Sequence, residues 1–234
     1  MAVHYDLFPM FRKEKILVLL LLLAGITFAA GPLVVDTVFV AFDTETTGFS
    51  PRKDRLVEIG AVKFRGDGEV LATTNWLVNP GRPIPWYTTD VHHITDAMVK
   101  DAPDFKEVWP EFSEFCDGTI LLAHNATFDV GFLKAELKRA KIKPIALPVA
   151  DTLPLFRDWF PRALSHSLEK LSTYLGVSGD TYHRAEADAF YIVNIFNIGM
   201  KRRSAMTMRR FEHDADGLDW LDGRKHNALN YLQR

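Results

Sequence analysis

The segment Val38–Ser50, VFVAFDTETTGFS, joins an unbroken apolar run to two acidic residues. An apolar run without alternation predicts a strand over 37–43 that is buried on both faces. Asp43 and Glu45 are two residues apart, so their side chains leave the same face of the extended chain. Two like charges on one face repel, and each is costly to desolvate without a partner. The segment therefore predicts that another group compensates these carboxylates.

The remaining apolar pattern indicates a mixed sheet covered by helices. Two further strands, joined by turn residues, extend the first into an antiparallel meander, and later strands alternate with helices. This order is typical of an α/β three-layer fold. The expected strands are 56–64, 70–78, 119–123 and 148–152, and the expected helices are 105–116, 127–140, 167–175 and 184–200.

The composition fits one medium-sized domain with appended segments. The chain has 234 residues, of which 47% are apolar and 25% charged, so a proper hydrophobic core is expected. A net charge of −2 excludes a global basic field, so binding to a polyanion needs local patches or metal ions. The single cysteine, Cys116, excludes an internal disulfide and a cysteine-rich zinc site.

An uncharged run, Ile16–Val35, follows a basic cluster near the N-terminus. The run reaches the roughly 20 residues that span a bilayer, and its unbroken Leu, Ile and Val residues leave no polar face for a core helix. We expect residues 16–35 to anchor the chain in a membrane, the inner membrane if the protein is bacterial. The alternative is a cleaved signal peptide, since Thr27–Ala29 loosely fits a cleavage site, and the protein would then be secreted or periplasmic.

Two more acids lie on the apolar faces of expected helices. Asp129 begins a stripe that continues through Phe132 and Leu133, although a first-turn acid is also favoured by the helix dipole. Asp188 is the lone acid on an otherwise apolar stripe, and such an acid usually has a cation beside it. Together with Asp43 and Glu45, these carboxylates offer oxygen ligands alone, which suit Mg²⁺ or Mn²⁺. Two such ions would serve the displacement used in phosphoryl transfer.

A histidine precedes the last of these acids. His183 lies five residues before Asp188, about 140° round a helix, so we expect it on the loop before the helix. There it could act as the general base, taking a proton from the attacking water, or it could be a surface histidine. His124 and Asn125 are expected to be loop residues that shape the site, with helix capping as the alternative for Asn125.

Read together, FDTETTG (42–48), HNATFDVGFL (124–133) and HRAEADA (183–189) resemble the three motifs of the DnaQ-like (DEDDh) 3′–5′ exonuclease family. The likeness implies a ribonuclease H-like fold and an exonuclease domain over 37–200, between an N-terminal segment, 1–36, and a basic tail, 201–234. It implies hydrolysis of nucleotides from a 3′ end, with two divalent cations. By the same likeness, the four acids bind the metals and His183 deprotonates the water. The residues implied to bind the terminal nucleotide are Thr46, Thr47, Phe49, His124, Asn125 and Phe128.

Several alternatives remain open at this stage. The substrate could be the 3′ end of single-stranded DNA or an RNA, because sugar discrimination depends on contacts that the sequence does not show. A membrane-tethered module that binds nucleic-acid ends without catalysis is a second class. Such a module would not need a general base, so it leaves His183 without a role. A glycosidase would explain Asp43 and Glu45 but leave the other acids without a role. The hydrophobic N-terminal run also argues against association with a polymerase or a sliding clamp.

Overall fold

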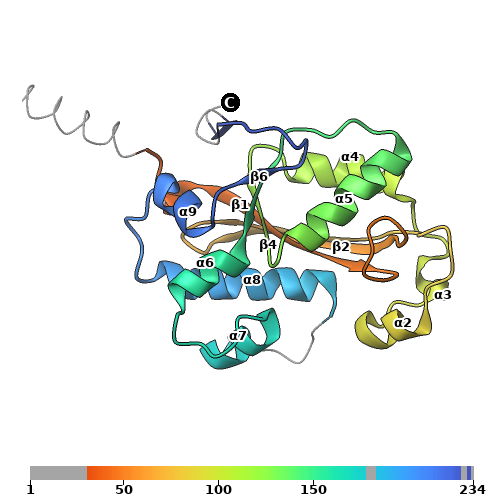
Figure 1. The fold of residues 1–234 in the computed structure, drawn as a ribbon, viewed down its shortest axis with the longest axis horizontal. Helices are drawn as coiled ribbons and strands as arrows, with labels where there is room; N and C mark the ends of the chain where they lie inside the picture. Colours follow the sequence, from red (N-terminus) through yellow and green to blue (C-terminus); the bar gives the residue numbers. More distant parts are fainter. Residues whose placement is uncertain (1–30, 178–182, 228–230, 233–234) are drawn as a thin grey trace, which may run out of the picture. The chain divides into compact units, whose positions relative to one another are not determined.

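The computed structural model describes residues 31–177, 183–227 and 231–232, and a compact unit runs from Pro32 to the C-terminus. Its centre is a six-stranded sheet in the order β3-β2-β1-β4-β5-β6 (Figure 1). β1, β4 and β5 are parallel, and the other neighbouring pairs are antiparallel. The strands are β1 (Val38–Thr46), β2 (Leu56–Arg65), β3 (Val70–Leu77), β4 (Ile120–Ala123), β5 (Pro148–Asp151) and β6 (Asp219–Trp220). The predicted fold class is confirmed.

Helices cover both faces of this sheet (Figure 1). A short 3₁₀ helix, η1 (Val34–Asp36), leads into β1. The other helices are α2 (Trp86–His92), α3 (Asp96–Val99), α4 (Phe105–Phe115), α5 (Thr127–Ala140), α6 (Thr152–Trp159), α7 (Leu168–Leu175), α8 (Ala185–Met200) and α9 (Met208–Asp214).

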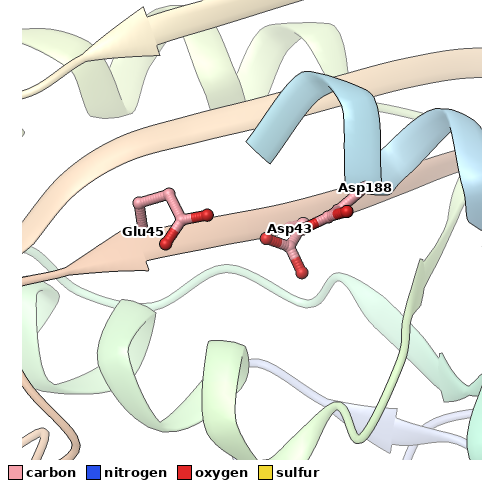
Figure 2. Close-up of side chains that lie close together, drawn as sticks. All are labelled: Asp43, Glu45 and Asp188. Atoms are coloured by element: carbon pink, nitrogen blue, oxygen red, sulfur yellow. The ribbon is translucent and has the colours of Figure 1, made fainter. Parts of the chain in front are cut away.

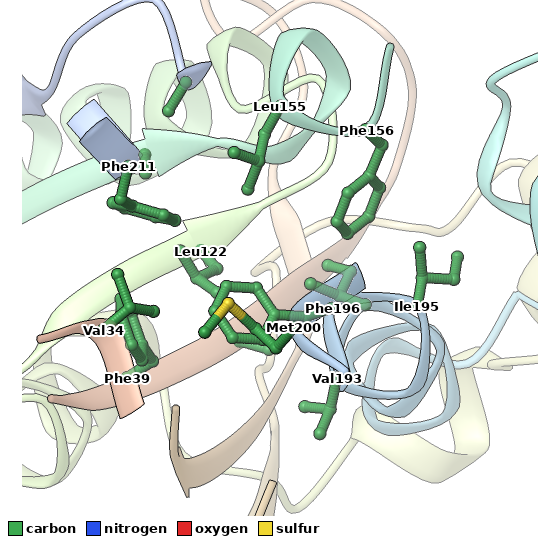
Figure 3. Packing of buried hydrophobic residues seen from close by; sticks show 14 of the residues in the cluster. Val34, Phe39, Leu122, Leu155, Phe156, Val193, Ile195, Phe196, Met200 and Phe211 are labelled. Atoms are coloured by element: carbon green, nitrogen blue, oxygen red, sulfur yellow. The ribbon is translucent and has the colours of Figure 1, made fainter. Parts of the chain in front are cut away.

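The alternation of side chains along β1 divides the core into two layers. Phe39 and Ala41 pack with α6, α8 and α9, whereas Val40 and Phe42 pack with α4 and α5. Figure 3 shows the first layer, where the Phe39 ring lies 5.3 Å from that of Phe196 and 5.4 Å from that of Phe211. Since side chains alternate along a strand, Asp43 and Glu45 leave β1 on the face that α8 covers.

The end of the hydrophobic run belongs to the folded unit. Val34 is fully buried in the layer beneath α8, and its N–H donates to the Met206 carbonyl at 2.9 Å. No helix among the described residues is long and apolar enough to cross a membrane. The anchor predicted over 16–35 is therefore wrong at its C-terminal end, where the chain enters the core. Residues 16–30 of that prediction lie outside the described residues.

The described part of the C-terminal tail packs on the same unit. Met208 and Phe211 of α9 are fully buried, and β6 forms the sheet edge beside β5. A buried Asp214 receives the Arg210 guanidinium at 2.6 Å, which fixes α9 further. These contacts make residues 206–221 part of the fold: Met206, Met208, Phe211 and Ala215 join the layer beneath α8, and Leu221 joins the layer of α4 and α5.

Candidate active site

Three carboxylates meet at the carboxyl end of β1. Asp43 and Glu45 come from this strand, and Asp188 comes from the first turn of α8 (Figure 2). One carboxylate oxygen from each residue lies within 4.8 Å of the other two. Asp43 and Glu45 are half-buried and Asp188 is buried, so water compensates their charges only in part.

A glycine on the neighbouring strand lets α8 approach this closely. Gly60 of β2 pairs with Asp43 in the sheet register. A Cβ at position 60 would lie 2.0 Å from the Glu186 nitrogen and 2.1 Å from the Ala185 carbonyl carbon. Backbone atoms cannot yield as a flexible side chain can, so any larger residue would push the start of α8, and Asp188 with it, away from β1.

The fourth predicted acid reaches the site from the other face of the sheet. Asp129 lies in the first turn of α5 and is 2% exposed. It accepts a hydrogen bond of 2.7 Å from the Thr44 hydroxyl, and Thr44 lies between the two acids of β1. The structure thus groups Asp43, Glu45 and Asp188, and it holds Asp129 beside them through Thr44.

Burial raises the pKa of all four acids, and repulsion within the set adds to the shifts of Asp43 and Glu45. Burial, followed by the charges of Asp129 and Asp188, raises the pKa of Asp43 well above its ordinary value. Burial, followed by the Asp188 charge, raises the pKa of Glu45 to about 8. Burial raises the pKa of Asp129 to about 7 and that of Asp188 to about 6. The cationic side chains in the described part of the chain therefore leave this negative charge under-compensated. An oxygen-only donor set of this kind fits Mg²⁺ or Mn²⁺.

His183 lies immediately before α8, on the loop. Its backbone is left-handed, with φ of 60°, and its N–H donates to the Asp188 carboxylate at 3.2 Å. The residue is exposed, and Arg184 separates it from the helix as the N-cap. The backbone contact places this exposed histidine next to the carboxylate cluster. A general base needs this combination of proximity and access to water.

The threonines after Glu45 build the turn at the end of β1. The Thr46 hydroxyl donates to the Gly48 carbonyl at 2.6 Å, and the Thr47 hydroxyl accepts the Arg55 N–H at 3.0 Å. Both side chains are buried, so they hold the turn in shape. Phe49, by contrast, leaves the turn with 84% of its surface exposed.

The residues predicted around α5 have different surroundings. His124 uses both ring nitrogens within the protein, at 3.0 Å from the Thr152 hydroxyl and 2.7 Å from the His166 carbonyl. Asn125 is exposed and left-handed, and Ala126 occupies the N-cap without a side-chain hydrogen bond, so Asn125 does not cap α5. Phe128 is half-buried, with its ring 5.0 Å from that of Phe132. Their contact with a nucleotide stays a prediction.

Sequence reasoning assigned no role to Glu58 of β2. This acid is fully buried and binds the Arg184 guanidinium at 2.6 Å. The available signal was an acid inside an otherwise apolar strand, LVEIGAV, the same signal that singled out Asp188. It was missed because its partner, Arg184, is 126 residues away in the sequence.

Exonucleases are among the solved structures with the same fold. Exonuclease X in complex with 5′-overhanging duplex DNA aligns with a TM-score of 0.60 and 27% identity, over 76% of this chain and 99% of its own. E. coli exonuclease I in complex with a dA16 oligonucleotide shares the fold, with a TM-score of 0.67, 19% identity, and coverage of 76% of this chain and 44% of its own. The fold and the carboxylate cluster define the class as an exonuclease of the ribonuclease H-like fold.

Sequence comparisons give the family. The family model RNase_T, described as "Exonuclease", matches residues 40–196. DNA polymerase III subunit epsilon of Treponema pallidum is 42% identical over 160 residues, which cover 68% of this chain and 74% of that protein. DNA polymerase III PolC-type of Clostridium perfringens is 41% identical over 71% of this chain but only 11% of its own length. The chain belongs to the RNase_T exonuclease family, and the predicted resemblance is confirmed.

These relatives also correct the predicted localisation. They are named as DNA polymerase III proteins, which contradicts both a membrane-anchored protein and the secreted or periplasmic alternative. The same hydrophobic run was the only reason to expect no polymerase partner, and the names of these relatives remove that reason.

The raised pKa values predict how pH affects stability without metal. Unfolded carboxyls have pKa values near 4, whereas those of Asp188, Asp129 and Glu45 in the fold are about 6, 7 and 8, so the folded state binds more protons between these limits. The free energy of unfolding should therefore fall as pH rises from about 4 to 8. In EDTA, Tm should fall between pH 5 and 8, and Mg²⁺ should reduce this fall. Equal slopes in EDTA, in Mg²⁺ and in an Asp43→Asn variant would contradict the cluster's role.

Proposed function

We propose that the chain is a metal-dependent 3′–5′ exonuclease that removes nucleotides from the 3′ end of single-stranded or frayed DNA. The observation that carries this proposal is the meeting of Asp43, Glu45 and Asp188, with oxygens within 4.8 Å, in an exonuclease fold. Carboxylates that repel one another at a strand end can bind divalent cations, which compensate their charge and serve phosphoryl transfer. Asp129 completes the set from the other face of the sheet.

The chain's own residues then have separate tasks. The four acids would hold two divalent cations, Mg²⁺ or Mn²⁺, which supply activation of water and charge stabilisation at the leaving oxygen. His183 accepts a proton from the attacking water as the new P–O bond forms. The bond from phosphorus to the 3′ oxygen of the preceding nucleotide breaks, and that oxygen takes up a proton. The products are a nucleoside 5′-monophosphate and a strand shortened by one residue.

The substrate site lies on the turn after β1. The turn beside Glu45, formed by residues 46–48, is held by hydrogen bonds and would bind the 3′ end. Phe49 offers an exposed ring for stacking on a base. Stacking of this kind is tolerant of sequence and suits a single-stranded end. The name of the T. pallidum relative, a DNA polymerase III subunit, favours DNA as the substrate and makes a polymerase a second partner to test.

Replacing Phe49 by alanine should weaken substrate binding while sparing the chemistry. Loss of base stacking, worth about 1–3 kcal/mol, predicts a rise in KM of roughly tenfold with kcat nearly unchanged. Steady-state digestion of a labelled DNA oligonucleotide measures both constants. Leu71→Ala is the control, since Leu71 is also exposed but lies at the far end of β3. Equal KM values in the two variants would remove Phe49 from the substrate site.

The nature of the substrate is tested by matched DNA and RNA oligonucleotides of one sequence. Each is offered with a free 3′-hydroxyl or a 3′-phosphate, in Mg²⁺, Mn²⁺ or EDTA. The proposal predicts faster digestion of the DNA, loss of activity in EDTA, and inhibition by the 3′-phosphate. Faster digestion of the RNA would make the chain a 3′–5′ exoribonuclease. Binding without digestion in every condition would make it a silent end-binding module.

A further inference from the structure

We propose that Glu58 and Arg184 form a positioning pair that sets the place of His183 and Asp188 against β1. The inference rests on the proposed function, because it assigns the pair to the assembly of that same site. Glu58 pairs with Glu45 in the sheet register, and its charge contributes to the raised pKa of Glu45, but it is not one of the three clustered carboxylates. It acts through the backbone at the start of α8.

The contacts of Glu58 are directed at the beginning of that helix. Its carboxylate accepts from Arg184 Nη2 at 2.6 Å and Nε at 3.2 Å, and from the Ala185 N–H at 3.0 Å. Asn75 of β3 donates to it at 2.9 Å. A fully buried carboxylate with these donors is held in one place, since losing any of them would leave charge uncompensated. The start of α8 is thereby tied to β2.

The sheet register connects this tie to the acids of β1. Glu58 pairs with Glu45, and Gly60, two residues further along β2, pairs with Asp43. Glu58 draws the backbone at Ala185 toward β2, and Gly60 leaves the space for it. Strand β2 therefore sets the distance between α8 and β1, because Glu58 binds the start of α8 and Gly60 leaves space for its backbone.

Because Arg184 lies between His183 and Asp188 in the sequence, its contact with Glu58 affects the positions of both residues. On one side, His183 has its left-handed backbone and donates to Asp188. On the other, Asp188 follows one helical turn later and joins the cluster. A shift at Arg184 would therefore move the general base and a metal ligand together. The pair does not replace a cation at the cluster, because the pKa of Glu45 stays raised to about 8 with Arg184 present.

The test uses Glu58→Gln and Arg184→Lys, with Thr73→Ala as the control. The Thr73 hydroxyl bonds the Glu186 carboxylate in the same turn of α8, but from β3 and on the exposed side. Loss of a group that orients metal ligands typically costs about 10–100-fold in metal affinity or activity. We expect such a fall in kcat, a matching rise in the Mn²⁺ concentration for half-maximal activity, and KM within about twofold of the parent. Thr73→Ala should keep the parent values.

Direct Mn²⁺ binding, measured by calorimetry without substrate, separates this inference from the proposed function. If the parent chain degrades no oligonucleotide, the proposed function fails, yet weaker Mn²⁺ binding in both variants would still support the positioning pair. Variants with a lower Tm but unchanged Mn²⁺ affinity and kcat would overturn it. Because Arg184 is a third exposed, Arg184→Lys should fold even if Glu58→Gln does not. A double variant should lose no more than the worse single variant, since the pair acts as a unit.

Discussion

Asp43→Asn should abolish metal-dependent digestion of a labelled oligonucleotide, with a loss in kcat of roughly 10³-fold or more, equivalent to about 4 kcal/mol. Asp43 is the member of the cluster with the largest number of acidic neighbours, because the charges of Asp129, Asp188, Glu45 and Glu58 all raise its pKa. Under the proposed function, the substitution removes the charge of a metal ligand. The amide keeps the size of the side chain, so the β1 register should survive.

The same substitution should stabilise the metal-free protein. A loss of activity together with a gain in stability distinguishes an effect on the site from general unfolding. Loss of one half-buried, repelling charge predicts a higher Tm in EDTA at pH 8 than in the parent chain. Asp67→Asn, in the exposed turn between β2 and β3, is the matched control and should change neither activity nor Tm. An Asp43→Asn variant with full activity would remove the cluster from the mechanism.

His183→Ala should lower kcat by about 10²–10⁴-fold, the usual contribution of a general base, while Mn²⁺ binding is retained. The contact of His183 with Asp188 comes from the backbone N–H, which alanine keeps. The variant should regain activity with rising pH, as hydroxide replaces the missing base, and with added imidazole, since position 183 is exposed. Digestion rates across pH and imidazole concentration measure this recovery.

His93→Gly is the control for the general base. His93 is also exposed and left-handed, with φ of 61°, so glycine fits its backbone without strain. This variant should keep the parent rate and show no imidazole response. A His183→Ala rate within threefold of the parent would assign His183 a surface role only.

Much of the fold follows from patterns in the sequence. The apolar run before Asp43, the turn chemistry after Phe64 and the later strand–helix alternation predict β1 to β5, α4, α5, α7 and α8. Helices α2 and α3 were not predicted, because they are short and follow a proline-rich loop. β6 has two residues, too few to give a pattern, and its place beside β5 depends on tertiary packing.

The site was predictable where periodicity applies. The spacing of Asp43 and Glu45 puts them on one face of a strand, and the apolar stripe around Asp188 points that acid toward the same sheet. No periodicity shows that Thr44 holds Asp129 on the opposite face, or that Glu58 binds Arg184. Both contacts join residues at least 85 positions apart, so they arise from the fold alone.

The N-terminal run shows a limit of hydropathy. Its last residues, Leu33–Val35, are apolar like most of those before them, but Val34 is buried in a protein core. Hydropathy measures how favourably a side chain leaves water. A protein core and a lipid bilayer are both apolar, so hydropathy does not distinguish them. The distinction came from the Val34 contacts and from the relatives, since neither is visible in the run itself.

The most direct test of the account is a time course with a single-stranded DNA labelled at its 5′ end, in Mg²⁺, with EDTA and Asp43→Asn as controls. The account predicts a ladder of labelled products that shorten one nucleotide at a time from the 3′ end, and no products in either control. Immediate release of labelled mononucleotide, internal cuts, or an unchanged ladder in EDTA or in Asp43→Asn would contradict it.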